Sequence, residues 1–465
     1  MGFTLMSNDL DLSSYDFTLP NDLIATEPIK PKENAKLLIY RNGKITHTTF
    51  YELFNYIPKD YLIVLNDTRV INARLFANKL SLESLHKTQI LNDSILPTKR
   101  EIFYHKHLSN NLHLVQIKGR AKLHDIFTLQ YNNTNVFIQV VDIKDDGYKV
   151  VSFFTLNDEF SVKSNLQNNF TTTNNLALHN DLNMQNNLAL NNSTLHNDFT
   201  LNKTLTQNNN ENLKNHSTQN NKNHNNNKDS TQNSSKVLNN ALNLQKLLAL
   251  KQLKQNILSQ EKVLSLLQTC GNIPLPPYMK RESTEKDSKD YQSIFAKSEG
   301  SVAAPTASLH FSESMFEILK ENYNHAFVTL HVGAGTFKPI TCENILNHKI
   351  HTESCIIAKK EAQKILESKK ILCVGTTAMR SVEWLIRENV AQIENDIMGE
   401  NAIFLNPFNP PKKVKALLTN FHLPKSSLLM LVSSIIGRKE TLRIYEEAIA
   451  NKYRFYSYGD GMLII

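Results

Sequence analysis

Hydrophobic and polar positions alternate in two different rhythms along the chain. Between residues 16 and 154, short runs rich in β-branched and aromatic residues are separated by turn sequences such as NN and KDDG. This pattern is typical of a small antiparallel barrel or sandwich. Between residues 270 and 465, strand-like runs alternate with segments of helical periodicity, which favours an α/β domain. The sequence therefore predicts an α/β part together with an all-β part.

The individual runs can be placed by residue number. In the first block we expect strands over residues 37–40, 62–66, 100–105, 112–119, 125–131, 136–143 and 148–154. In the second block, strand-like and helix-like segments alternate over residues 326–332, 361–369, 371–377, 380–389, 415–421, 426–436 and 439–453.

Residues 155–245 fit neither rhythm, because Asn and other polar residues dominate and Gly, Pro and Trp are absent. Such a segment buries too little apolar surface to offset the entropy of ordering, so we expect a disordered low-complexity insertion. Its low density of cations favours a tolerated surface insertion over an RNA-binding arm. Residues 243–268 have apolar positions at helical spacing, which predicts a helix and makes residues 246–261 a helical lead-in. A second, smaller candidate insertion lies near residues 80–99.

Composition narrows the functional classes. Lys and Arg number 52 against 44 Asp and Glu, a formal charge of +8 that fits a nucleic-acid partner without requiring one. Four scattered cysteines without a C-x-x-C pair exclude a disulfide scaffold and a zinc ribbon. No apolar run is long enough to span a membrane, and residues 1–17 lack the pattern of a signal peptide. We therefore expect a soluble cytoplasmic protein.

Several segments carry candidate chemistry, each with a plain structural alternative. Three prolines stiffen residues 271–282, which present Tyr278, Lys280 and Arg281 either as a ligand-binding edge or as a linker. Small residues in 300–311 permit close approach to a ligand beside Thr306 and His310. Ser308 stands too near His310 in sequence to indicate a catalytic nucleophile and base.

Strand ends supply further candidates. The glycine turn after residues 328–332 is followed too closely by Lys338 and Pro339 for a dinucleotide-binding helix. His331 in that strand is either a core histidine or a catalyst, and Asp67 follows an apolar strand where site residues are common. Period two places His351 and Glu353 on one face of a strand, as an acid–base pair or a surface pair.

A strand–turn–helix sequence occupies residues 371–384. Thr376 or Thr377 suits the N-cap of the helix, and Arg380 follows one turn later. The amides of that turn and the guanidinium suit a carboxylate or phosphate, although an ordinary α/β turn has the same sequence pattern. At the C-terminus, aromatic residues at 453, 455, 456 and 458 flank Arg454 and Asp460, which indicates either base stacking or a packed strand.

The motifs as a set resemble the S-adenosylmethionine:tRNA ribosyltransferase-isomerase family of queuosine biosynthesis. The matching segments keep the family's order and cover nearly all of both blocks, at residues 15–29, 65–76, 271–282, 291–311, 329–340, 351–353, 374–384, 419–437 and 453–464. The chain departs from the family at Ser308, where Gly is usual, and at Glu299, where Pro is usual. The Asn-rich tract has no counterpart in the resemblance.

The resemblance implies both a fold and a reaction. The fold would be a barrel-like α/β domain, residues 1–72 and 262–465, with a smaller antiparallel β-barrel domain inserted at residues 73–154. The reaction transfers and isomerises the ribosyl part of S-adenosylmethionine onto 7-aminomethyl-7-deazaguanine at the tRNA wobble position. Epoxyqueuosine in tRNA, adenine and methionine are the products. S-adenosylmethionine is thus a co-substrate, no metal is expected, and we expect a monomer. The alternatives are an inactive tRNA-binding descendant or another S-adenosylmethionine-dependent RNA-modifying enzyme.

Site residues follow from setting this chemistry against the matching motifs. A base must take a ribose C5′ proton, and an acid must protonate the departing adenine. The candidates for the base are Asp67, His331 and Glu353, and the candidates for the acid are His310, His351 and Asp460. The candidates for binding S-adenosylmethionine are Tyr278, Tyr291, Thr306, Phe337, Thr376, Thr377 and Arg380. The candidates for binding tRNA are Arg69, Lys280, Arg281 and Arg454.

Overall fold

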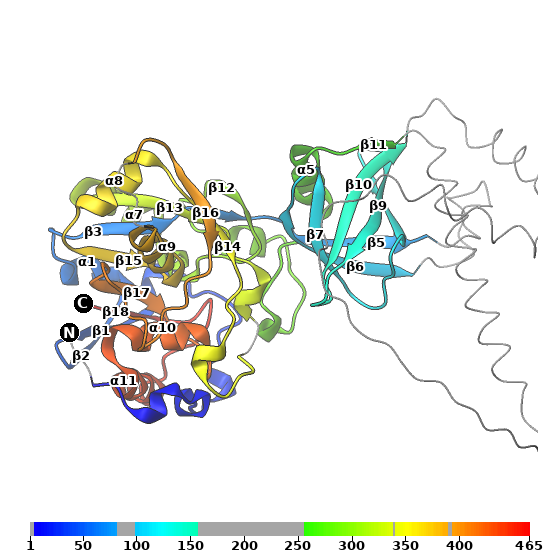
Figure 1. The fold of residues 1–465 in the computed structure, drawn as a ribbon. Helices are drawn as coiled ribbons and strands as arrows, with labels where there is room; N and C mark the ends of the chain where they lie inside the picture. The colour runs from blue at the N-terminus through cyan, green and yellow to red at the C-terminus, as the bar shows by residue number, and fades with distance from the viewer. Residues whose placement is uncertain (1–3, 81–97, 157–254, 338–339, 389–392) are drawn as a thin grey trace, which may run out of the picture.

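The computed structural model describes residues 4–80, 98–156, 255–337, 340–388 and 393–465. Two β-sheets with separate hydrophobic cores organise these residues and lie side by side (Figure 1). We call them the large sheet and the closed sheet. The expected low-complexity insertion and the candidate insertion near residues 80–99 fall almost wholly outside the described residues.

The large sheet has nine strands in the order β16-β14-β13-β3-β15-β17-β18-β1-β2. In chain order these strands are β1 Lys36–Arg41, β2 Lys44–Thr49, β3 Leu62–Asn66, β13 His325–Leu330, β14 Glu353–Ile357, β15 Ile371–Val374, β16 Ile397–Asn401, β17 Ala416–Asn420 and β18 Gly461–Ile464. The end strands β16 and β2 do not pair with each other in the part of the chain described. The barrel-like shape expected for the α/β part is therefore wrong at the level of strand pairing, because the sheet has two open edges.

Four neighbouring strands in the middle of this sheet, β13, β3, β15 and β17, run parallel to one another. Both faces of such a sheet are covered, so the strands read as continuous apolar runs. Along β3, Leu62 and Val64 enter one hydrophobic core while Ile63 and Leu65 enter the other. The strict alternation of side chains across a strand thus builds two cores from one five-residue sequence.

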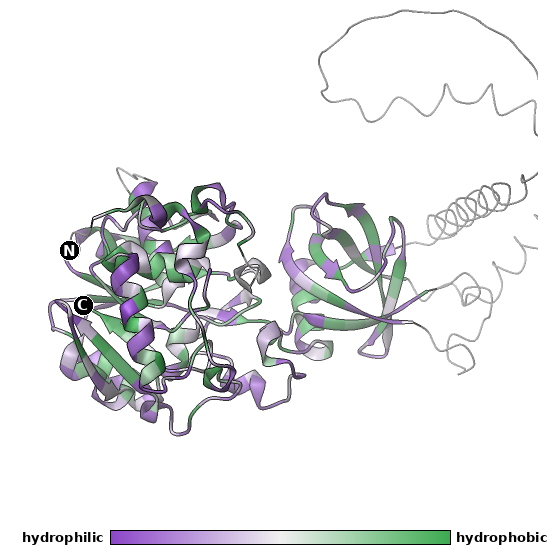
Figure 2. Ribbon diagram, turned by 90° about the horizontal axis from the view of Figure 1, so that it is seen from below, coloured by the Kyte–Doolittle hydropathy of each residue, from purple (hydrophilic) through white to green (hydrophobic). Residues whose placement is uncertain are grey.

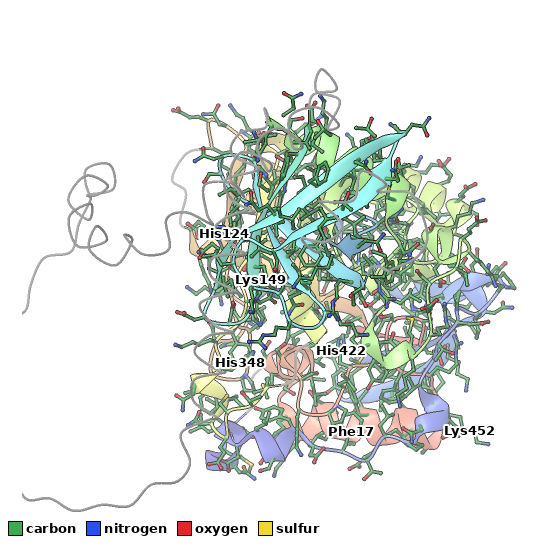
Figure 3. The ribbon with its side chains drawn as sticks, turned by 90° about the vertical axis from the view of Figure 1, so that its right-hand side faces the viewer. Phe17, His124, Lys149, His348, His422 and Lys452 are labelled. Carbon is green, nitrogen blue, oxygen red and sulfur yellow. The ribbon has the colours of Figure 1, made fainter. Side chains whose placement is uncertain are left out.

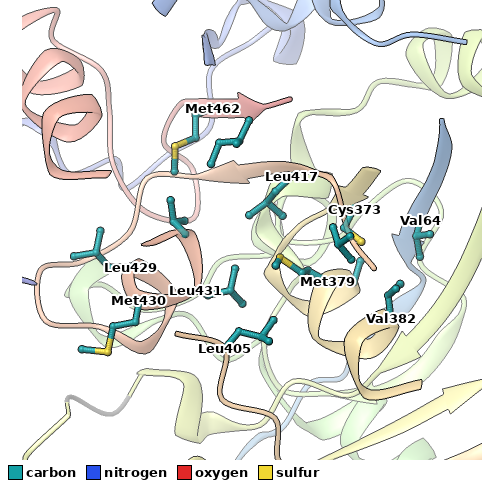
Figure 4. Close-up of a cluster of buried hydrophobic side chains, with 14 of the residues drawn as sticks. Val64, Cys373, Met379, Val382, Leu405, Leu417, Leu429, Met430, Leu431 and Met462 are labelled. Atoms are coloured by element: carbon teal, nitrogen blue, oxygen red, sulfur yellow. The ribbon is translucent and has the colours of Figure 1, made fainter. Parts of the chain in front are cut away.

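Helices cover both faces. On one face, α8 (Lys359–Glu367), α9 (Thr376–Arg387), α10 (Ser427–Ile436) and α11 (Arg438–Ala450) supply apolar side chains to the first core. Figure 4 shows Met379 and Val382 of α9 facing Val64, Cys373 and Leu417 of the sheet. On the other face, α1 (Leu53–Tyr56) and α7 (Glu313–Asn322) pack in the second core. The predicted strands and helices of the second block are confirmed, and α7 is an addition.

The closed sheet has seven strands in the order β11-β10-β7-β6-β5-β8-β9. Its strands are β5 Arg74–Lys79, β6 Lys99–His107, β7 Leu112–Ile117, β8 Ile126–Tyr131, β9 Thr134–Ile143, β10 Lys149–Leu156 and β11 Gln255–Ile257. A further pairing of β10 with β9 joins the two sides, so the six strands β5 to β10 form a closed ring. Apolar residues (green) and polar residues (purple) mix along its strands in Figure 2.

Helix α5 (Gln260–Cys270) packs against this ring, with Val263, Leu266 and Leu267 fully buried in its core. The expected helix at residues 243–268 is therefore confirmed only in its second half. Residues 255–257 form strand β11 instead, because they pair with residues 154–156 of β10. Residues 243–254 lie outside the described residues.

The chain enters and leaves the closed sheet at one place. Arg74 and Asn272 exchange two backbone hydrogen bonds of 3.1 and 3.0 Å, which pin the two crossings together. Short elements complete the described fold: strands β4 (Thr68–Val70) and β12 (Ser298–Ser301), helix α6 (Asp287–Asp290), and 3-10 turns that include η7 (Thr306–His310) and η8 (Ala334–Phe337). Within the described ranges, no helix is both long and apolar enough to cross a membrane.

Candidate active site

The candidate site lies where the parallel strands of the large sheet end. Because β3, β13, β15 and β17 run the same way, their carboxyl ends meet at one edge of the sheet. Asp67, His331, Thr376 and Phe421 follow these strands within two residues. Ligands of open α/β sheets bind in the crevice outside such carboxyl ends. The fold therefore brings together candidates that are more than 300 residues apart in sequence.

Two adjoining cavities open at this edge. The larger cavity, of about 400 Å³, is lined by Glu353, Arg380 and His351 among others. The smaller cavity, of about 170 Å³, is lined by Tyr278, Thr306 and Tyr456 among others. Four residues line both cavities: Thr336, Thr376, Thr377 and Leu428. In the view of Figure 3, the labels of His348 from the larger cavity and His422 from the smaller one appear below that of Lys149 in the closed sheet.

Glu353 and Arg380 form a buried ion pair at the larger cavity. Glu353 Oε1 also accepts hydrogen bonds from the Gly333 amide at 3.0 Å and Thr336 Oγ1 at 3.2 Å. Arg380 Nε donates to the Ile403 carbonyl, while its Nη2 has no hydrogen-bond partner among the described residues. A carboxylate held this firmly is poorly placed to act as a base. The free N–H of a buried guanidinium suits an acceptor oxygen on a ligand.

His351 precedes β14 and does not share a strand face with Glu353, so the expected pairing on one face is wrong. The strand begins only at Glu353, and His351 is exposed while Glu353 is buried. Both residues nevertheless line the larger cavity.

The amino end of α9 is built differently from the prediction. Gly375, with φ of +89°, is the N-cap, and Thr376 and Thr377 are the first two helical residues. Glycine adopts this left-handed φ without the steric cost that a threonine would meet. The two threonines face both cavities, and Thr377 Oγ1 is buried without a hydrogen-bond partner among the described residues. The turn thus offers a hydroxyl and helix amides to a ligand.

Asp67 and His331 each make polar contacts of their own at the strand ends, and neither lines either cavity. Thr329 Oγ1 donates to Asp67 Oδ1 at 2.6 Å, and burial raises the pKa of Asp67 above its usual range. Thr68 Oγ1 lies 2.8 Å from His331 Nδ1, and burial lowers the pKa of His331. A half-buried carboxyl with a raised pKa accepts a proton more readily than an exposed one. Burial thus makes Asp67 a stronger proton acceptor than an exposed carboxyl, and makes His331 a weaker one than an exposed imidazole.

His310 is buried and held in place by neighbouring side chains. Its ring stacks on Phe50 with centroids 4.0 Å apart, and its Nε2 lies 3.2 Å from Asn420 Nδ2. Thr306 Oγ1 donates to the Oδ1 of the same Asn420 at 2.8 Å. Burial lowers the pKa of His310 to about 3. The imidazole is therefore neutral near pH 7 and accepts a hydrogen bond from the Asn420 amide, which disfavours it as a general acid.

Asp460 lines neither cavity, and its carboxylate binds backbone amides. Its two oxygens accept hydrogen bonds from the amides of Lys36 at 2.9 Å and Arg454 at 2.7 Å. Its side chain is 1% exposed, and burial raises its pKa. These contacts explain Asp460 as the anchor of the C-terminal segment.

The three aromatic residues expected to bind S-adenosylmethionine lie in different surroundings. Tyr278 lines the smaller cavity, and its hydroxyl accepts a hydrogen bond from the Ser457 amide at 3.0 Å. Tyr291 is completely buried in a satellite core and lines neither cavity. Phe337 ends η8, and its side chain lies outside the described residues.

The four basic residues expected to bind tRNA differ in whether their charges already have partners within the protein. Arg281 makes two hydrogen bonds of 2.7 and 2.8 Å to Asp287, and Arg69 lies 3.8 Å from Glu299. Arg454 donates to the Glu27 carbonyl and lies 3.7 Å from Asp460. Lys280 is exposed.

A groove of about 870 Å³ separates the closed sheet from residues 274–282. Its lining contains four cations and three carboxylates: Arg74, Lys118, Lys280, Arg281, Glu101, Asp146 and Glu282. Lys280 and Arg281 thus face the closed sheet rather than the two cavities. Across the described ranges, no group of three or more His, Cys, Asp or Glu is arranged to hold a metal ion.

Sequence reasoning assigned no role to several cavity residues: Thr336, Asn420, His422 and Leu428. All four lie in segments that carry the family resemblance, so the motif marked their neighbourhood. It did not single them out, because an amide or a leucine has no chemical signature in sequence. Only the position of each residue at the carboxyl edge identifies it.

The described residues form an α/β protein with a pair of cavities at the carboxyl edge of its mixed sheet and with an additional closed sheet. Comparison with known proteins narrows this class. The sequence model of a family described as "Queuosine biosynthesis protein" matches residues 12–169 and 160–464. The chain belongs to this family.

The names of curated proteins with similar sequences agree with this family. A protein of Helicobacter pylori is 40% identical over 461 residues, covering 98% of this chain and 99% of its own length. One of Helicobacter hepaticus is 37% identical over 470 residues, covering 99% and 98%. Both are named S-adenosylmethionine:tRNA ribosyltransferase-isomerase. A solved structure of an S-adenosylmethionine tRNA ribosyltransferase from Thermotoga maritima is 21% identical, covering 97% of this chain and 100% of its own, with a TM-score of 0.41.

Proposed function

We propose that this protein transfers and isomerises the ribosyl moiety of S-adenosylmethionine onto 7-aminomethyl-7-deazaguanine at the tRNA wobble position. The observation that carries the proposal is the match to relatives of this activity over 98% of the chain. The products are epoxyqueuosine in tRNA, adenine and methionine. The adjoining cavities at the carboxyl edge give the small co-substrate a place to bind.

The methionine end of S-adenosylmethionine fits the larger cavity. Arg380 Nη2 and Thr377 Oγ1 are buried polar groups without partners among the described residues, and both residues line that cavity. A ligand carboxylate would satisfy both groups, and a charge-assisted hydrogen bond to a buried guanidinium is among the strong ones. The Glu353 carboxylate holds Arg380 in position from the other side.

Asp67 is the base in this proposal. The positive sulfur of the co-substrate acidifies the neighbouring C5′–H, and Asp67 takes that proton while Thr329 orients its carboxyl. Loss of adenine requires protonation of a ring nitrogen. Of the three acids considered from sequence, His310 and Asp460 line neither cavity. His351, exposed at the larger cavity, is the acid that we assign.

The tRNA is proposed to lie across the groove beside the closed sheet, which we infer to be the small β-barrel domain expected at residues 73–154. The described residues 73–80 and 98–156 contain ten Lys or Arg against five Asp or Glu. This excess supplies the attraction to phosphates that dominates nucleic-acid binding. Lys280, exposed in the groove, is the expected phosphate contact. We further propose that the protein acts as a cytoplasmic monomer.

Product analysis tests the proposal. The protein is incubated with S-adenosylmethionine and tRNA carrying 7-aminomethyl-7-deazaguanine, and the nucleosides of the tRNA are separated by chromatography and mass spectrometry. Formation of epoxyqueuosine supports the proposal. Formation of S-adenosylhomocysteine instead would identify a methyltransferase. Tight tRNA binding without any product would identify an inactive descendant.

A further inference from the structure

Tyr456 has a backbone conformation that is unusual for a bulky side chain. Its φ is +74°, in the left-handed region that glycine and asparagine normally occupy. Residues held in such conformations persist only where the surrounding structure fixes them, and they cluster at ligand sites. The conformation of Tyr456 therefore needs a physical cause.

Hydrogen bonds on both sides of Tyr456 supply the cause. Its amide donates to the Phe421 carbonyl at 3.0 Å, and its carbonyl accepts from the Gly459 amide at 3.0 Å. Gly459 is required for this turn, since an added Cβ would lie 2.5 Å from the Arg454 carbonyl oxygen. The next amide, that of Ser457, donates to the Tyr278 hydroxyl. The loop thus fixes Tyr456 from three neighbouring segments.

The ring of Tyr456 packs against the first core but stays partly exposed. The other three aromatic residues of this segment are at most 2% exposed: Tyr453, Phe455 and Tyr458. Tyr456 alone of the four is partly exposed, and it lines the smaller cavity. Its ring packs on that of Tyr278 with centroids 4.2 Å apart and planes inclined by 35°.

The smaller cavity has the size and lining of a site for one flat ring system. Its volume of about 170 Å³ is below the roughly 300–1,000 Å³ typical of sites for whole drug-sized ligands. Aromatic and aliphatic walls come from Phe421, Leu423 and Leu428, and polar groups come from Thr306 and Ser457. Apolar faces with polar groups at the margin suit a heterocycle that stacks by its faces and hydrogen-bonds at its edge.

We propose that Tyr456 and Tyr278 form an aromatic wall against which the adenine of S-adenosylmethionine packs in the smaller cavity. The inference rests on the proposed function and adds the orientation of the co-substrate. The two cavities share Thr336, Thr376 and Thr377, and the unpartnered Arg380 lies in the larger one. A ligand with a carboxylate at one end and a flat base at the other fits this arrangement. The tRNA base has no carboxylate to engage Arg380, which favours adenine as the occupant.

The test uses the full-length protein and 5′-methylthioadenosine, a nucleoside that carries adenine but no carboxylate, with affinity measured by calorimetry in the absence of tRNA. Tyr456→Ala should weaken binding by about ten-fold or more, the loss expected for one stacking contact. Tyr456→Phe should retain the affinity because it keeps the ring. Tyr458→Phe, which changes a neighbouring buried tyrosine outside the cavities, is the matched control and should bind normally.

Tyr456→Gly separates a loss of the ring from a loss of the fold. Glycine accepts the left-handed φ, so this variant should unfold at a temperature no lower than that of Tyr456→Ala and still lose affinity. Unchanged nucleoside affinity in both Tyr456→Ala and Tyr456→Gly would overturn the proposal, as would a wild-type protein that does not bind the nucleoside. So would unchanged nucleoside affinity combined with a raised KM for the modified tRNA, which would assign the cavity to the acceptor base.

Failure of the aromatic wall and failure of the proposed function give different results. Ring-dependent nucleoside binding in a protein that forms no epoxyqueuosine would keep the adenine site and reject the reaction. Normal epoxyqueuosine formation with nucleoside binding that ignores Tyr456 would keep the reaction and reject the aromatic wall.

Discussion

Arg380 and Glu353 form an ion pair that is buried on the protein side and open on the cavity side. Glu353 is 4% exposed and Arg380 is 7% exposed. The guanidinium uses Nη1 for the carboxylate and Nε for the Ile403 carbonyl, which leaves Nη2 for a ligand. Removing one partner of a buried pair leaves the other charge uncompensated, and that is costly. The pair therefore links the stability of the fold to recognition of the co-substrate.

Glu353→Gln should lower the free energy of unfolding by about 3–5 kcal/mol, because the Arg380 charge stays buried without its partner. Glutamine keeps an oxygen for the Gly333 amide and Thr336, so the loss measures the charge. The Glu353→Gln/Arg380→Gln double variant should regain most of the stability. Urea denaturation measures all three proteins. A double variant as unstable as the single one would show that the ion pair does not account for the loss.

The same double variant should bind S-adenosylhomocysteine at least ten-fold more weakly, since a charge-assisted hydrogen bond is worth about 1.5–3 kcal/mol. Binding of 5′-methylthioadenosine, which lacks the carboxylate, should change little. Calorimetry with both ligands gives the comparison. An equal loss for the two ligands would contradict the placing of the carboxylate at Arg380.

Asp67→Asn should lower kcat by about 10²–10⁴-fold, the range typical for loss of a general base. In the wild-type protein, activity should fall as the pH drops through the pKa of Asp67, which burial raises above its ordinary value of 3.8. Thr329→Val removes a hydrogen bond that lowers this pKa, so the acid limb of the pH–rate profile should move to higher pH. An acid limb that does not move would separate Asp67 from the proton transfer.

As the pH is lowered, the protein should begin to lose stability at a pH well above the pKa of its buried histidines. Burial lowers the pKa of His310 and His422 from 6.5 to about 3. Between these values the unfolded chain binds protons that the folded chain does not, so stability falls as the pH falls below about 6.5. Each imidazole should cost roughly 2 kcal/mol between pH 6.5 and pH 5. His310→Gln should flatten the dependence of the urea midpoint on pH, and an unchanged slope would contradict a neutral, buried His310.

Ser308 is fully buried in η7, and its Oγ has no hydrogen-bond partner among the described residues. Ser308→Ala should raise the free energy of unfolding by about 1 kcal/mol, because a buried hydroxyl without a partner costs free energy. Ser301→Ala is the matched control. Its equally buried hydroxyl donates to the Ala303 carbonyl and accepts from the Val332 amide, so its removal should destabilise. Destabilisation by Ser308→Ala would mean that its hydroxyl is satisfied in solution.

The fold could be predicted where local periodicity decides the structure. The parallel strands of the large sheet and helices α8 to α11 were placed correctly, because buried strands read as apolar runs and helices show an apolar face. Strand β11 could not be found, since residues 255–257 are polar or exposed and are held only by pairing with β10. The open edges of the large sheet likewise depend on long-range pairing that no local pattern contains.

Which residues gather at the site could be predicted from the sequence better than the role of each residue. The carboxyl edge gathers Asp67, His331 and Thr376 as strand ends imply. The contacts that separate the candidates are tertiary, such as the stacking of Phe50 on His310 and the two amides that occupy Asp460. Tyr456 differs from its aromatic neighbours in its backbone angle, its exposure and its place at the smaller cavity, none of which the sequence reveals.

Release of free adenine is the measurement that tests the account most directly. The protein is mixed with S-adenosylmethionine and either tRNA carrying 7-aminomethyl-7-deazaguanine or the same tRNA with an ordinary guanine, and adenine is measured by chromatography. The account predicts adenine release with the modified tRNA, none with the unmodified tRNA, and a loss of about 10²–10⁴-fold in Asp67→Asn. Equal release with both tRNAs, or none with either while the modified tRNA is bound, would contradict it.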